Sequence, residues 1–129
     1  MATIKSYTDL EQSKKLAKVL PLESADMFYN EEPEDETYPK DIVDTEYPMV
    51  IRESHKHLLE EYGIPCWSLA ALLYVIPERI IKNYYAPNLQ KENGKYSIAY
   101  GDDELLCIAD NPVDACVAMI EKLNELNLL

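Results

Sequence analysis

The sequence predicts an α+β fold: a single small domain, residues 1–129, in which helices pack on an antiparallel β-meander of about three to four strands. Three observations predict it. Cap motifs followed by apolar residues at helical spacing stand near both ends of the chain. Between them, an Asn-Gly pair flanked by short alternating runs is the strongest local pattern for a hairpin. The length of 129 residues suits one domain, which buries about two thirds of its surface on folding.

The first helix is predicted from its cap. Thr8 and Glu11 have the spacing of a T-x-x-E capping box, and the helix should stop before Pro21. Its apolar stripe consists of Leu10, Leu16, Ala17 and Leu20.

Residues 23–48 are predicted to be an acidic, irregular excursion. They contain three prolines and few apolar residues, and a short strand is expected only near Tyr47–Ile51. Long irregular segments inside small domains are often functional, so we expect recognition to occur here. After it, residues 50–62 suit a helix that ends at Gly63 as a glycine cap.

A mostly apolar segment, residues 63–77, reads GIPCWSLAALLYVIP. Pro65 disfavours helix before it, and Ser68 is a natural N-cap for a helix that starts at Leu69. Trp67 is placed to pack on Leu72 as a hydrophobic staple. Because residues 69–76 leave no polar face, this helix is predicted to be buried nearly all round.

The second half of the chain predicts the meander and a last helix. Strands are expected over residues 80–92, with Pro87 on a sheet edge, over 96–100 and over 104–109. The last strand is apolar on both faces, so it should pair further, either with Tyr47–Ile51 or with the same strand of a second copy, forming a homodimer. Asn111 and Pro112 then begin a helix as N-cap and first residue.

Charge restricts the partners of the protein. The net charge of −12 argues against direct nucleic-acid binding, because phosphates require Lys and Arg. Residues 23–46 contain ten acids and one base, Lys40, and so hold −9 of this charge. Such a segment is usually a solvated loop; the functional alternative is an acidic surface that binds a basic partner, including as a mimic of nucleic-acid charge. The residues proposed for it are Glu31, Glu32, Glu34, Asp35 and Glu36.

The motif content predicts no cofactor and no metal site. The three cysteines form no C-x-x-C pair, which favours reduced thiols in a cytoplasmic protein over disulfides or a zinc ribbon. No signal-peptide pattern and no run of about 18 apolar residues occurs, so neither secretion nor membrane insertion is expected. Phosphate-binding and hydrolase motifs are also lacking from the sequence.

Two weaker candidate sites remain. Cys66 with His55 or His57 would be a cysteine-dependent enzyme, but Cys66 precedes the predicted cap and a free cysteine is more often a small buried hydrophobe. His55 and His57, two apart on a predicted helix, point in different directions and would not share a metal. The other candidate is a pocket for a small anionic ligand such as a nucleotide, in which aromatic rings stack and cations neutralise. Its residues would be Arg79, Lys82, Tyr84 and Tyr85.

Three blocks of the sequence carry a resemblance: SYTDLEQSKKLAKVLPLESADMFY, IPCWSLAALLYVIP and NPVDACVAMIEKLNEL. Together they cover about half of the chain, and they resemble small uncharacterised proteins of phages and mobile elements from gut Bacteroides-type bacteria. The resemblance implies a phage or mobile-element origin and a bacterial host cytoplasm. It implies no activity and no catalytic residue.

These observations together favour a non-enzymatic accessory protein that binds a host protein through an acidic surface, for example as an inhibitor of a host factor or of host defence. The alternatives are a protein that binds or sequesters a small ligand and, less favoured, the cysteine-dependent enzyme.

Overall fold

The computed structural model describes residues 4–30, 44–51, 63–80, 86–101 and 105–129, with the side chains of residues 44–46 left aside. The described residues contain three α-helices, one 3-10 helix and six strands in two three-stranded antiparallel sheets, which confirms the α+β class. The chain divides into two compact units. We call residues 9–68 the hairpin unit and residues 1–8 with 69–129 the meander unit. The assignment of the whole chain to a single domain stays a prediction.

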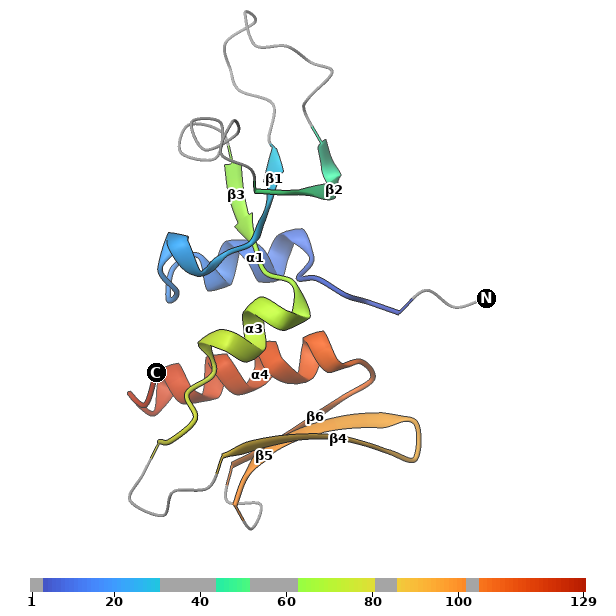
Figure 1. Ribbon diagram of the computed structural model, residues 1–129, viewed down its shortest axis with the longest axis vertical. Helices are drawn as coiled ribbons and strands as arrows, with labels where there is room; N and C mark the ends of the chain where they lie inside the picture. Colours follow the sequence, from blue (N-terminus) through green and yellow to red (C-terminus); the bar gives the residue numbers. More distant parts are fainter. Residues whose placement is uncertain (1–3, 31–43, 52–62, 81–85, 102–104) are drawn as a thin grey trace, which may run out of the picture. The chain divides into compact units, whose positions relative to one another are not determined.

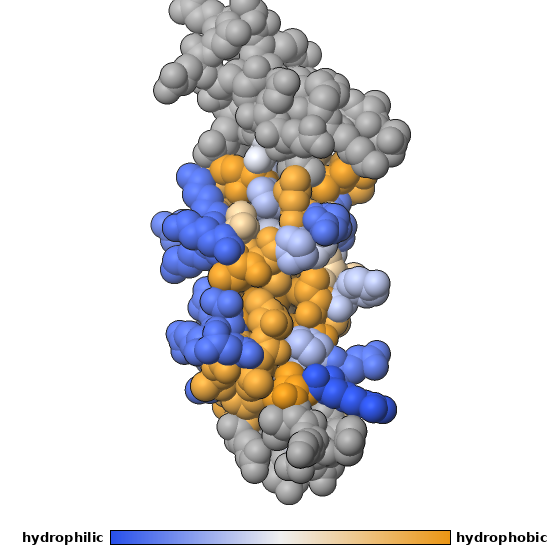
Figure 2. Space-filling view, turned by 90° about the vertical axis from the view of Figure 1, so that its left-hand side faces the viewer, coloured by the Kyte–Doolittle hydropathy of each residue, from blue (hydrophilic) through white to orange (hydrophobic). Residues whose placement is uncertain are grey.

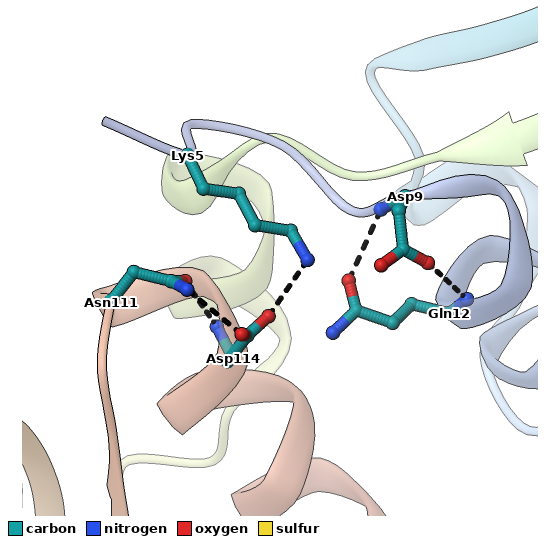
Figure 3. Close-up of polar contacts among 5 residues, drawn as sticks. All are labelled: Lys5, Asp9, Gln12, Asn111 and Asp114. Atoms are coloured by element: carbon teal, nitrogen blue, oxygen red, sulfur yellow. Dashed lines mark hydrogen bonds and ion pairs between the residues drawn. The ribbon is translucent and has the colours of Figure 1, made fainter. Parts of the chain in front are cut away.

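The hairpin unit begins with α1 (Leu10–Leu16). Its cap is Asp9, whose Oδ1 accepts from the Gln12 backbone N–H at 2.8 Å, while Gln12 Oε1 accepts from the Asp9 N–H at 3.1 Å (Figure 3). The prediction of Thr8 and Glu11 as the capping box was therefore wrong by one residue. Both pairs have the required spacing, but Thr8 is fully buried and Asp9 is exposed. Leu16 and Leu20 are buried as predicted, whereas Ala17 is exposed.

The sheet of the hairpin unit has the order β2-β1-β3. It follows the 3-10 helix η1 (Leu22–Ser24) and consists of β1 (Met27–Asn30), β2 (Asp44–Val50) and β3 (Gly63–Cys66). β1 pairs antiparallel with both neighbours, and α1 packs against β3 (Figure 1). The core includes Leu16, Phe28, Tyr29, Cys66 and Trp67, each at most 2% exposed.

Three predictions for this region are corrected. The irregular excursion contains a strand at 27–30, because Phe28, Tyr29 and Asn30 are buried between two neighbouring strands. Val50 belongs to β2 and not to a helix, and Gly63 begins β3. The strand expected near Tyr47–Ile51 exists, but it starts earlier, at Asp44. The predicted helix beyond residue 51, with His55 and His57, lies outside the described residues.

The meander unit stacks two helices on the second sheet. α3 (Leu69–Val75) packs on α4 (Pro112–Glu125), and α4 packs on β5 (Lys95–Tyr100) and β6 (Leu105–Ala109), so that α4 lies between α3 and the sheet (Figure 1). The sheet order is β4-β5-β6, with β4 at Pro87–Glu92, and this confirms the meander. Its core residues on β5 and α4 are Ile98, Val113, Cys116, Ile120 and Leu123, all without exposed surface.

The Asn-Gly hairpin and the last helix are as predicted. Asn93 and Gly94 connect β4 to β5 with φ of 53° and 75°, the paired positive values of a type I′ turn. Asn111 Oδ1 accepts from the Asp114 N–H at 2.8 Å, and Pro112 is the first residue of α4. Asp114 in turn accepts from Asn111 Nδ2 and forms an ion pair with Lys5 at 2.8 Å (Figure 3).

Three predictions for the meander unit were wrong. α3 begins at Leu69 as expected, but it is not buried all round: Leu73 is 41% and Tyr74 89% exposed. The first strand starts at Pro87 and not at residue 80. The described part of β6 pairs with β5 and not with Tyr47–Ile51, whose strand β2 belongs to the other sheet.

Candidate functional site

The acidic segment is the connection between two paired strands. β1 ends at Asn30 and β2 begins at Asp44, and these two residues are register partners. Asn30 and Asp44, which flank residues 31–43 in the sequence, are therefore neighbours in the hairpin-unit sheet (Figure 1). The five acidic residues proposed from the sequence, Glu31, Glu32, Glu34, Asp35 and Glu36, lie in this connection, outside the described residues.

Strand β2, which follows the acidic segment in the sequence, carries exposed apolar side chains. Tyr47 and Val50 are each 60% exposed, whereas Pro48 and Met49 are partly buried. Figure 2 shows, on the face that it draws, hydrophobic surface reaching the exterior with hydrophilic side chains beside it. Aromatic residues such as tyrosine are enriched at protein interfaces. Sequence reasoning placed a strand here but did not identify Tyr47 and Val50 as surface residues.

Hydrogen bonds fix the start of β1. Asp26, which precedes β1, accepts from the Ser68 backbone N–H at 2.9 Å and from the Ser68 hydroxyl. The Trp67 indole Nε1 donates to Ser24 Oγ at 2.9 Å, and the Ser24 hydroxyl donates to the Pro21 carbonyl at 2.6 Å. These bonds tie the chain before β1 to the chain after β3. β1, the strand that precedes the acidic connection, is thus anchored by hydrogen bonds as well as by strand pairing.

Cys66, the candidate nucleophile, is the last residue of β3 and has no exposed surface. Its proposed partners His55 and His57 lie outside the described residues. Cys116 is also fully buried, and burial raises the pKa of its thiol to about 11. Burial raises the pKa of Cys107 as well, and the nearby Lys122 ammonium lowers it in part. Full burial, as for Cys66 and Cys116, is typical of structural cysteines, whereas Cys107 is partly exposed.

Of the four residues proposed for the small-ligand pocket, the structure describes Arg79 alone. The exposed Arg79 follows α3, while Lys82, Tyr84 and Tyr85 lie outside the described residues. In the described ranges, no group of three or more His, Cys, Asp or Glu side chains could hold a metal ion. None of the helices in the part of the chain that the structure describes is long and apolar enough to cross a membrane.

The described elements define a small α+β protein with two antiparallel sheets. Comparison with protein-family models, with curated proteins and with solved structures finds no match.

Proposed function

We propose that this protein is a non-enzymatic binding protein whose acidic connection between β1 and β2 engages a basic surface on a protein partner. The observation that carries the proposal is the pairing of Asn30 with Asp44, because it presents the most acidic part of the chain from an anchored pair of strands. In line with the sequence resemblance, we place the partner in the host cytoplasm of a phage or mobile element. Inhibition of a host factor is the activity that such binding would have.

Electrostatics supports a basic partner. Residues 23–46 concentrate −9 of the net charge of −12, so the potential near this part of the chain is strongly negative. Opposite charge on a partner raises the association rate. Dissolved salt weakens this attraction, because charges further apart than a Debye length, about 8 Å at physiological ionic strength, are largely screened from each other. Binding should therefore weaken as salt is added.

Tyr47 supplies the apolar part of the proposed interface. Charged segments steer encounter, but most binding free energy comes from a few buried anchors, among which tyrosine is enriched. Tyr47 lies on β2, the strand that follows the acidic segment in the sequence, and stands three residues after Asp44, the first residue of β2. We therefore expect Tyr47→Ala to raise the dissociation rate of the complex and to leave the association rate nearly unchanged.

The test compares two variants of equal net charge. One carries Glu→Gln at positions 31, 32, 34 and 36; the control carries Glu→Gln at the exposed positions 78, 92, 121 and 125. Each variant and the wild type are used to capture proteins from a lysate of a gut Bacteroides-type bacterium at low and high salt. The captured partner is then purified, and its association rate with each form is measured.

The expected result is a loss of about tenfold or more in the association rate for the first variant alone, with a shallower salt dependence. For the tyrosine, Tyr74→Ala on α3 is the control, since Tyr74 is 89% exposed and belongs to the other unit. Equal binding by the two Glu→Gln variants would contradict the proposal. If Tyr47→Ala bound the partner as well as wild type does, Tyr47 would not be an apolar anchor of the interface.

A further inference from the structure

Among the residues that the structure describes, the outer edge of β6 has no pairing strand. β6 pairs with β5 alone among the described strands, and no other backbone hydrogen bond involves Leu105–Ala109 there. Which groups face outward follows from the Asn93-Gly94 turn. In a type I′ turn the residues on either side, here Glu92 and Lys95, form a hydrogen-bonded pair.

The pattern then alternates across the sheet. Lys95, Ser97 and Ala99 direct their backbone groups at β4. The alternate residues of β5, Tyr96, Ile98 and Tyr100, therefore bond to β6. On β6 it is consequently the register partners of those residues, Leu105, Cys107 and Ala109, that bond to β5. The N–H and C=O groups of Leu106 and Ile108 point away from the sheet.

The β4 edge of the same sheet carries residues that hinder pairing, whereas the residues of β6 itself do not. By the same alternation, Pro87, Leu89 and Lys91 face outward on β4. Pro87 has no N–H to offer, and Lys91 brings a charge, two ordinary means of preventing edge-to-edge pairing. The β6 sequence, LLCIA, contains neither proline nor charge. Its outward-pointing residues also have exposed apolar side chains, 39% for Leu106 and 60% for Ile108.

We propose that β6 pairs antiparallel with β6 of a second copy, about a two-fold axis at Cys107, to form a homodimer with a continuous six-stranded sheet. In this register Leu106 of each copy faces Ile108 of the other, so that the outward groups of both residues are satisfied. Their side chains then form one apolar cluster on the face opposite α4. A second copy fits because the edge is complementary to itself in both its hydrogen-bonding groups and its side chains.

Cys107 reports on this register. It faces Cys107 of the other copy in a non-hydrogen-bonded pair, where Cα atoms lie about 4.5 Å apart. That distance is within the range that a disulfide bridges, roughly 4.4–6.8 Å. Cys107 is partly exposed, while Cys66 and Cys116 have no exposed surface.

Salt separates this dimer from the proposed partner binding. Each copy carries a net charge of −12, so the two copies repel at long range. Added salt screens this repulsion and should strengthen the dimer, whereas it should weaken binding to a basic partner. The two proposals are independent, and either can fail alone.

The first test is sedimentation equilibrium of the full chain over a range of concentrations. Wild type should dimerise, and Ile108→Pro should raise the dimer dissociation constant about tenfold or more, because two symmetry-related backbone bonds are lost. Lys91→Pro is the matched control, since it removes an outward N–H from the other edge of the same sheet. Should the proline variants fail to fold, Ile108→Lys with Gln90→Lys as its control tests the same edges, because both residues align with Ser97 across the sheet.

The second test is cross-linking with diamide, which takes up the two thiol hydrogens as a disulfide forms. A covalent dimer should appear with wild type and with Cys66→Ser, and it should disappear with Cys107→Ser. A wild type that stays monomeric at all concentrations would overturn the proposal, as would a dimer equally sensitive to changes on both edges. A dimer that forms no Cys107 cross-link would overturn the register about Cys107.

Discussion

Trp67 is the largest side chain without exposed surface in the described part of the chain. Its indole Nε1 donates to Ser24 Oγ at 2.9 Å, and the Ser24 hydroxyl in turn donates to the Pro21 carbonyl. The ring therefore fills volume in the core and also joins the end of β3 to the 3-10 helix before β1. Two substitutions separate these contributions.

Trp67→Ala should lower the free energy of unfolding by about 3–5 kcal/mol, the usual cost of removing a buried aromatic side chain. Ser24→Ala keeps the ring and removes the acceptor of the indole N–H. A buried donor left without a partner costs about 1–3 kcal/mol, so we expect a smaller loss. Since small proteins are stable by only about 5–15 kcal/mol, the alanine at position 67 removes a large part of the total.

Urea unfolding followed by far-ultraviolet circular dichroism measures these changes as shifts of the midpoint. Tyr74→Ala is the matched control, because that side chain is 89% exposed and its loss should change stability by no more than about 0.5 kcal/mol. If Trp67→Ala were as stable as Tyr74→Ala, the ring would not be a core residue.

Two further predictions concern the meander unit. Gly94→Ala should destabilise the protein by about 1–2 kcal/mol through backbone strain alone, since Gly94 has φ of 75° and an added Cβ would meet nothing within 4 Å; urea unfolding measures it, and no loss would argue against the type I′ turn. Burial raises the pKa of Tyr100 from 10.0 to about 12, so between these values the unfolded chain loses the phenolic proton while the folded protein keeps it, and stability falls as pH rises. Unfolding of wild type and Tyr100→Phe should be measured across this pH range. As pH rises, wild type should lose stability relative to Tyr100→Phe, and a stability difference that stays constant would contradict the raised pKa of Tyr100.

The elements that the sequence predicts well are those encoded by neighbouring residues. The Asn93-Gly94 hairpin and the α4 cap each require a few adjacent side chains of the right type, and both are present as expected. β1 and β3 were missed because each has four residues and no alternating pattern. They form because they pair with each other across more than thirty positions of the chain, and no local pattern contains that information.

The surface of α3 was mispredicted for a related reason. Leu73 is as apolar as the buried Leu72, Tyr74 has a large aromatic ring, and composition does not say which side of α3 meets α4. The candidate site shows the same division. Its acidity is evident from the sequence, but the exposure of Tyr47 and Val50 depends on the pairing of β2 with β1.

The pairing of Asn30 with Asp44 also makes the segment between them replaceable. Loop closure costs only about 0.6 kcal/mol more when a flexible loop doubles in length, provided that the strands hold its ends. Residues 31–43 could thus be lengthened or exchanged for another peptide while β1 and β2 remain paired. The hairpin unit is in this sense a natural scaffold for display, into which unrelated recognition sequences could be grafted and selected.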